Sequence, residues 1–189
     1  MKMNTIVLFA GFGLMAGMSA NVESHQAAEA STSAQSTASI SVATLQSAEQ
    51  VRRTGDFLLA PVKSRFDLIN YVHAIPHSPL DRLSPSAKQR FLASLTFNES
   101  GLTGFDYSDL RAELTVTEVY QVLSIFGAQR LTSMVRGARV LTATDKALQV
   151  SPSPMGGGSI GMPDDHEGYV CQGAHTCAKR DEHICMTGC

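Results

Sequence analysis

Apolar residues recur at helical spacing through the middle of the chain, between about Ser41 and Val150. The first clear stripe has steps of three or four residues, the repeat that places side chains on one face of a helix. The stripe consists of Val62, Phe66, Ile69, Val72 and Ile75. Pro76 follows and ends this helix, because proline lacks the backbone N–H and clashes with the preceding turn. A second stripe, after Ser84-Pro85, starts with a capping side chain and a proline at the first helical position. It consists of Ala87, Phe91, Leu92 and Leu95.

The clearest helix signal starts at Thr115. Thr115-Val-Thr-Glu118 has the form of a capping box, in which each of the two side chains accepts a backbone N–H that the helix leaves unpaired. Apolar residues fill the next turns, and Gly127 provides a left-handed terminator. A last helix is predicted from a further apolar side, although Gly137 inside it costs about 1 kcal/mol relative to alanine. That side consists of Leu131, Met134, Val135, Ala138 and Leu141.

Strand-like alternation of apolar and polar residues is nearly absent from the chain. The segment Asn98–Gly104 contains two glycines and is predicted to be a turn-rich break. A further helix is expected around Ala43–Arg53, where the apolar pattern is weaker. We therefore predict an all-α fold, a small bundle of four or five helices, in a single domain over residues 41–150.

The N-terminus has the three parts of a secretory signal peptide over residues 1–20. Lys2 supplies a positive charge, an uncharged apolar run spans Ile6–Met18, and small residues follow up to Ala20. A membrane span is the alternative, but it requires about 20 predominantly apolar residues, and this run is shorter. We expect export, to the periplasm or outside the cell, with cleavage near Ala20 and no membrane span in the mature chain.

Two segments of biased composition flank the predicted helical domain. Residues 21–40 are rich in Ala, Ser, Thr and Gln and are expected to form a low-complexity linker. Residues 151–165 contain three prolines and four glycines and are expected to form a second linker. The formal net charge of −2 gives no electrostatic reason to expect binding to nucleic acid or to an anionic membrane. Tryptophan is absent and aromatic residues make up 6% of the chain, so the core is expected to be aliphatic.

All the cysteines lie in the tail, residues 166–189: Cys171, Cys177, Cys185 and Cys189. In an exported chain, four closely spaced cysteines predict two disulfides, and three pairings are possible. A metal site is the alternative interpretation, with His175, Cys177, His183 and Cys185 as ligands for zinc or copper(I). The spacing lacks a C-x₂-C pair, and thiols outside the cytoplasm tend to be oxidised. The disulfide interpretation is therefore preferred.

Two histidine or serine patterns resemble catalytic or metal motifs but lack the structure that these need. Residues 157–161 match G-x-S-x-G, yet proline-rich segments on both sides leave neither the strand nor the helix of a serine hydrolase. His73 and His77 have the spacing of two ligands on one helix face, but Pro76 lies between them. We expect neither an esterase site nor a metal site here.

Two charged groups are also interpreted as structural. Asp106, Asp109 and Glu113 are candidates for an acid/base pair, but acidic residues also favour the start of a helix. Arg130, Arg136 and Arg139 are expected to form a solvated helix face, because no aromatic residues accompany them.

With no supported catalytic group in the predicted domain, we expect an exported, non-enzymatic helical protein that binds a protein partner. Its disulfide-bonded tail either presents a binding element or folds back onto the helices as a lock. Two alternatives remain open: a metal-binding or metal-delivery protein that uses the tail, and a precursor from which a Cys-rich peptide is released at the 151–165 linker. Catalysis by the acidic group is a weaker fourth hypothesis.

Overall fold

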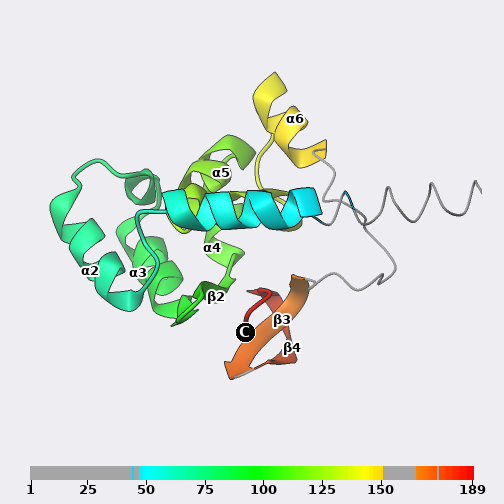
Figure 1. The fold of residues 1–189 in the computed structure, drawn as a ribbon. Helices are drawn as coiled ribbons and strands as arrows, with labels where there is room; N and C mark the ends of the chain where they lie inside the picture. The colour runs from blue at the N-terminus through cyan, green and yellow to red at the C-terminus, as the bar shows by residue number, and fades with distance from the viewer. Residues whose placement is uncertain (1–43, 45–46, 151–164, 174) are drawn as a thin grey trace, which may run out of the picture. The chain divides into compact units, whose positions relative to one another are not determined.

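The computed structural model describes residues 44, 47–150, 165–173 and 175–189 (Figure 1). All of them belong to the second of two compact units, Thr44–Cys189. Several sequence predictions concern residues outside this part of the chain. They are the signal peptide at residues 1–20, the linker at 21–40, the linker at 151–165 apart from Asp165, and the G-x-S-x-G match at 157–161.

The described residues form a mixed α/β fold, so the prediction of an all-α bundle is wrong. Its helices are accompanied by a four-stranded antiparallel sheet with the strand order β1-β2-β4-β3. The strands are β1 (Thr96–Asn98), β2 (Gly101–Asp106), β3 (His166–Gly173) and β4 (Thr176–Cys185). β2 thus begins inside the predicted turn-rich break, β1 ends at its first residue, and β3 and β4 lie in the predicted tail. Because β4 pairs with β2, the tail is not a module apart from the helices.

The helices follow several of the sequence signals. After a helix over residues 47–59, the elements are α2 (Arg65–Ala74), the 3₁₀ helix η1 (Pro79–Arg82), α3 (Pro85–Ser94), α4 (Ser108–Glu113), α5 (Val116–Ser124), the 3₁₀ helix η2 (Gln129–Met134) and α6 (Ala143–Val150). The Ser84 hydroxyl accepts a hydrogen bond from the Ala87 N–H and caps α3, as predicted. Thr115 and Glu118 form the predicted capping box at the start of α5. These local predictions are confirmed.

The apolar stripe predicted to line the core side of α2 is mostly exposed. Val62 is fully buried, but it precedes the helix, and its N–H donates to the Ile125 carbonyl at 3.1 Å. The helix itself buries Leu68, whereas Phe66 and Ile69 are 71% and 51% exposed. Since Val62 lies outside the helix, its burial carried no information about which helix face meets the core.

The predicted last helix is broken into separate pieces. η2 ends at Met134, and Gly137 then adopts a left-handed backbone conformation with a φ of +89°. Arg139 pairs with Thr115 in an isolated β-bridge, which draws this segment alongside the start of α5. Helical structure resumes only at Ala143. Gly137, which was predicted to lie inside a helix, is therefore a point at which the chain turns.

A single apolar cluster joins the helices to the sheet. Phe91 of α3 makes edge-on contacts with Phe105 of β2 and with Phe126, both at 6.2 Å between ring centroids. Ile184 of β4 is fully buried in the same cluster. A Cβ atom at Gly104 would lie 2.8 Å from the Ile184 carbonyl oxygen, so the glycine is what allows β4 to lie against β2.

Candidate functional site: a disulfide-bonded hairpin

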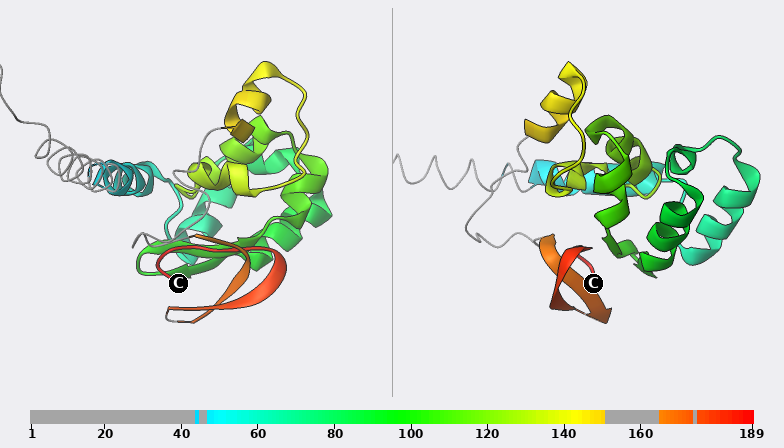
Figure 2. Two further views of the ribbon diagram at one scale, coloured as in Figure 1. Left: turned by 90° about the vertical axis from the view of Figure 1, so that its right-hand side faces the viewer. Right: turned by 180° about the vertical axis from the view of Figure 1, so that it is seen from behind.

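The tail forms a hairpin of β3 and β4 that curls back on itself (Figure 2). Near its turn, Cys171 pairs with Cys177, and at its open end Glu167 pairs with Ile184. Between these pairs the ladder is irregular: β4 has more residues than β3, and Glu182 has a φ of +61°. The curvature brings the two ends of β4 together, which the sequence spacing did not reveal.

Both predicted disulfides are present in the structure. Cys171 is joined to Cys189, with 5.6 Å between their Cα atoms, and Cys177 is joined to Cys185, with 6.1 Å. The second bridge lies within the segment that the first one encloses. Of the three pairings left open by the sequence, the structure has this nested one, because the curled hairpin places the ends of β4 side by side.

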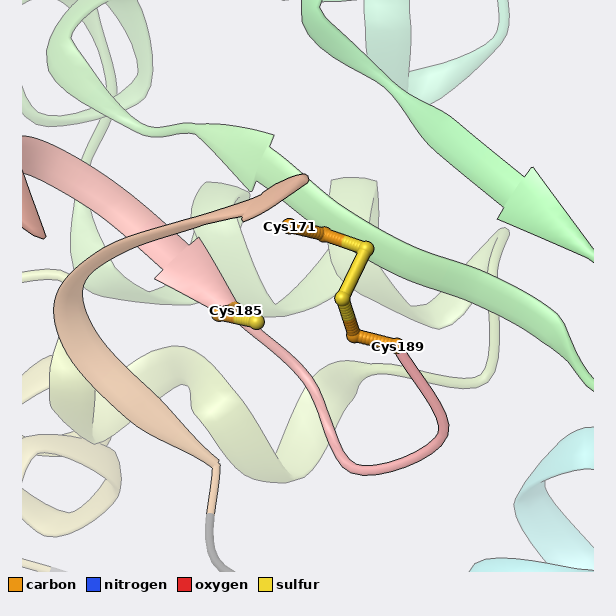
Figure 3. A group of neighbouring side chains, drawn as sticks. All are labelled: Cys171, Cys185 and Cys189. Carbon is orange, nitrogen blue, oxygen red and sulfur yellow. A yellow bond between two sulfur atoms is a disulfide. The ribbon is translucent and has the colours of Figure 1, made fainter. Parts of the chain in front are cut away.

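Sulfur atoms of the two bridges lie close to one another. The Sγ atoms of Cys171, Cys185 and Cys189 are all within 4.8 Å of one another, and Figure 3 shows the three side chains converging from β3, from the end of β4 and from the terminal turn. Cys185 and Cys189 are buried, and Cys171 is half-buried. We call these three residues the sulfur cluster. It is the one group of three or more His, Cys, Asp or Glu side chains with ligand atoms this close among the described residues.

Backbone hydrogen bonds and apolar packing hold the hairpin against the rest of the protein. Gly104 of β2 pairs with Cys185, and the Met186 N–H donates to the Thr103 carbonyl at 2.8 Å. Ile184 and Met186 are 0% and 6% exposed within the core. The hairpin is thus folded back onto the helices.

A charged cluster fixes the start of the hairpin. The carboxylate of Asp165, whose side chain is 5% exposed, lies 3.3 Å from the Arg53 guanidinium and 3.5 Å from that of Arg130. It also accepts the Thr187 N–H at 2.7 Å. Arg53 pairs in turn with Glu49 at 3.1 Å. Burial lowers the pKa of Arg130, and the nearby Asp165 carboxylate offsets part of this change. The cluster joins the 47–59 helix, η2 and both ends of the hairpin.

A second polar link attaches β3. The Tyr107 hydroxyl donates to Glu167 of β3 at 3.0 Å, and the Arg136 guanidinium lies 2.9 Å from the other oxygen of that carboxylate. Burial and the hydrogen bond to Glu167 raise the pKa of Tyr107 to about 12. Tyr107 is therefore a neutral donor at physiological pH.

Of the two histidines of the alternative metal site, His183 has polar partners for its ring, whereas His175 is exposed and is held through its backbone. His183 is 7% exposed, with Nδ1 2.9 Å from the Asp181 carbonyl oxygen and Nε2 3.8 Å from the Asp106 carboxylate. The backbone N–H of His175 donates to the Cys189 carbonyl at 2.7 Å. Within the described residues, His175 and His183 are not gathered with Cys177 and Cys185 into a common ligand set.

The acidic group around α4 is engaged in capping and ion pairs. Asp106 accepts the Ser108 N–H at 2.8 Å, and Asp109 pairs with the Arg90 guanidinium. The N–H and hydroxyl of Ser84 donate to Glu113 at 2.6 and 2.7 Å and lower its pKa. Each of these carboxylates thus has a structural partner of its own.

The remaining candidate side chains are separated by the fold. α2 ends at Ala74, so His73 and His77 do not share a helix face. The three arginines do not share one helix face, because Arg130 lies in η2 and belongs to the charged cluster, whereas the exposed Arg136 follows the end of η2 and contacts Glu167. Arg139 donates to the Glu113 carbonyl.

Comparison of the chain with protein-family models, with curated proteins and with solved structures gave no match. Among the helices that the structure describes, none combines the length and the apolar character needed to cross a membrane.

Proposed function

We propose that the chain is an exported, non-enzymatic protein that binds a protein partner through apolar side chains at the end of the 47–59 helix and on α2. The curled hairpin acts as a lock that keeps the core closed. The disulfides support export, because such bridges form and persist mainly outside the cytoplasm. The apparent signal peptide at residues 1–20 supports it from the sequence.

The exposed apolar side chains carry the proposal. Leu58 and Leu59 are 65% and 86% exposed at the end of the first helix, and Phe66 and Ile69 are 71% and 51% exposed on α2. Single exposed apolar residues are common on protein surfaces, but four large ones within a short stretch of the chain favour an interaction surface. Phenylalanine and isoleucine bury much apolar area for few rotamers, which favours a protein partner.

Catalysis has less support than binding. The carboxylates Asp106, Asp109 and Glu113 each have a structural partner, and the two disulfides leave the described residues without a free thiol. A nucleophile or a general base would need a free side chain near a second functional group.

The precursor interpretation also has less support. Cutting the chain between Val150 and Asp165 would leave Ile184 and Met186 buried in the core. The fragment would then stay bound, so release of a peptide would require the core to open.

Photocrosslinking in the producing cells tests the proposal. A benzoylphenylalanine at position 66 should give a discrete protein adduct, and Ile69→Ser should reduce its yield. A benzoylphenylalanine at Leu141 is the matched control, because Leu141 is also 71% exposed. Identical adducts from positions 66 and 141, or no adduct from position 66, would contradict the proposal.

A further inference from the structure

The sulfur cluster unites cysteines of both bridges. Cys185 belongs to one disulfide, whereas Cys171 and Cys189 form the other, yet the three sulfur atoms lie within 4.8 Å of one another (Figure 3). Sulfurs that bind one metal ion at about 2.3 Å lie roughly 4 Å apart. The three side chains therefore need only small movements to meet at one ion once the bridges are opened.

The scaffold around the cluster does not depend on the bridges alone. Ile184 and Met186 remain anchored in the core, and the Met186 N–H is bonded to the Thr103 carbonyl. The Cys189 carbonyl accepts the His175 N–H, and the Cys189 N–H donates to Met186 at 3.0 Å. These contacts hold the backbone on both sides of the cluster, so reduction leaves the cysteines close together.

We propose that reduction of both disulfides converts the sulfur cluster into a binding site for Cu(I), with the thiolates of Cys171, Cys185 and Cys189 as its ligands. Soft thiolates select Cu(I) or zinc among the biological metals. Zinc in a structural site takes four ligands; the Cys177 sulfur is bonded to that of Cys185 but is not within 4.8 Å of all three cluster sulfurs, and no histidine lies in the cluster, so only three ligand atoms converge. This site is independent of the proposed apolar binding surface.

The chemistry balances with a small thiol as reductant. Four equivalents of the small thiol open the two bridges, giving four cysteine thiols and two small-molecule disulfides. Cu⁺ then displaces three protons and forms a complex of three thiolates with a net charge of −2.

The two halves of one bridge provide a matched pair of variants. Cys177→Ser and Cys185→Ser remove the same disulfide, but only Cys185→Ser removes a member of the cluster. The mature protein is reduced, desalted without oxygen and titrated with Cu(I) in competition with bicinchoninate. Wild type and Cys177→Ser should each bind one Cu(I), and Cys185→Ser should bind at least about tenfold more weakly, because losing a group that only hydrogen-bonds to a metal ligand already costs about 10–100-fold in metal affinity.

Three outcomes would overturn the proposal. The first is equal loss of affinity in both variants, which would indicate a four-thiolate site. The second is a Cys185→Ser variant that binds Cu(I) as tightly as Cys177→Ser does. Non-specific binding to an unfolded reduced chain would give this result, and circular dichroism of the same samples would detect the unfolding. The third is a wild-type protein that binds Cu(I) equally well with its disulfides intact.

Discussion

Truncation of Ile184 tests whether the hairpin belongs to the core. This side chain of β4 is fully buried in the cluster formed by α3, α5 and β2. Ile184→Ala removes three carbon atoms, worth about 2.5 kcal/mol at ~0.8 kcal/mol for each buried methylene. The cavity that remains raises the expected loss to about 3–4 kcal/mol, within the range measured for isoleucine-to-alanine changes in other cores.

The assay is urea unfolding of the protein with both disulfides intact. With an m-value of about 2 kcal/mol/M, the midpoint of the Ile184→Ala variant should fall by roughly 1.5–2 M at unchanged m. Ile69→Ala on α2 is the control, because it makes the same chemical change at a side chain that is 51% exposed. Its midpoint should change by less than about 0.25 M, because a surface substitution usually changes the free energy of unfolding by less than about 0.5 kcal/mol. Equal midpoints for Ile184→Ala and wild type would mean that the hairpin does not contribute to the core, and the reasoning would fail.

Three further predictions concern the contacts around the hairpin and the start of α5. Thr115→Ala should cost about 1 kcal/mol of unfolding free energy in urea, because the capping side chain at the start of α5 is lost. Asp165→Ala should cost about 3 kcal/mol in the same assay, because it leaves the Arg130 guanidinium buried without its carboxylate, whereas Arg53 keeps its ion pair with Glu49. The pKa of Tyr107, raised to about 12, predicts that stability falls as the pH rises from about 10 to 12, where the unfolded state loses the phenolic proton first. Tyr107→Phe should remove this part of the pH dependence. In a titration of the folded protein followed by tyrosinate absorbance, the variant should also lack the absorbance that appears at the highest pH.

The capping signals could be predicted because they depend on neighbouring residues alone. Thr115 and Glu118 satisfy each other's backbone N–H groups within a single turn, and Ser84 caps α3 in the same way. Such contacts need no knowledge of the tertiary fold. The burial of α2 does need it: the helix was expected, but the face that meets the core is determined by Leu68 and its partners in other elements.

The sheet was missed for two reasons. Every residue of β2 except Asp106 is buried, so the strand shows no alternation of apolar and polar positions. Its neighbour β4 lies about 80 residues later in a polar segment whose pairing depends on long-range contacts. One local signal was present: Gly104 stands between Leu102 and Phe105, and a glycine inside a strand often marks close approach of another backbone.

The candidate site was predictable in composition but not in geometry. Oxidised cysteines followed from the apparent signal peptide and the spacing of the tail. The nested pairing and the sulfur cluster follow from the curl of β4, which depends on the left-handed backbone at Glu182 and on the docking of Ile184. The repeated His-x-Cys pattern directed attention to His175 and His183, whereas the residues that converge with Cys185 are Cys171 and Cys189.

The bridges and the core contacts of the hairpin have separate roles. Both disulfides lie entirely within the tail and close short loops, with sequence separations of 18 and 8 residues. In the chain-entropy model, bridges that close such loops stabilise the folded state by about 3.2 and about 2.5 kcal/mol. This stabilisation favours the fold of the hairpin itself and does not hold the hairpin against the helices. Attachment to the helices rests on Ile184, on the close approach at Gly104 and on the ion pairs of Asp165. Reduction should therefore loosen the hairpin while its two anchored ends stay docked, and this is the state in which three thiolates remain near enough to share one ion.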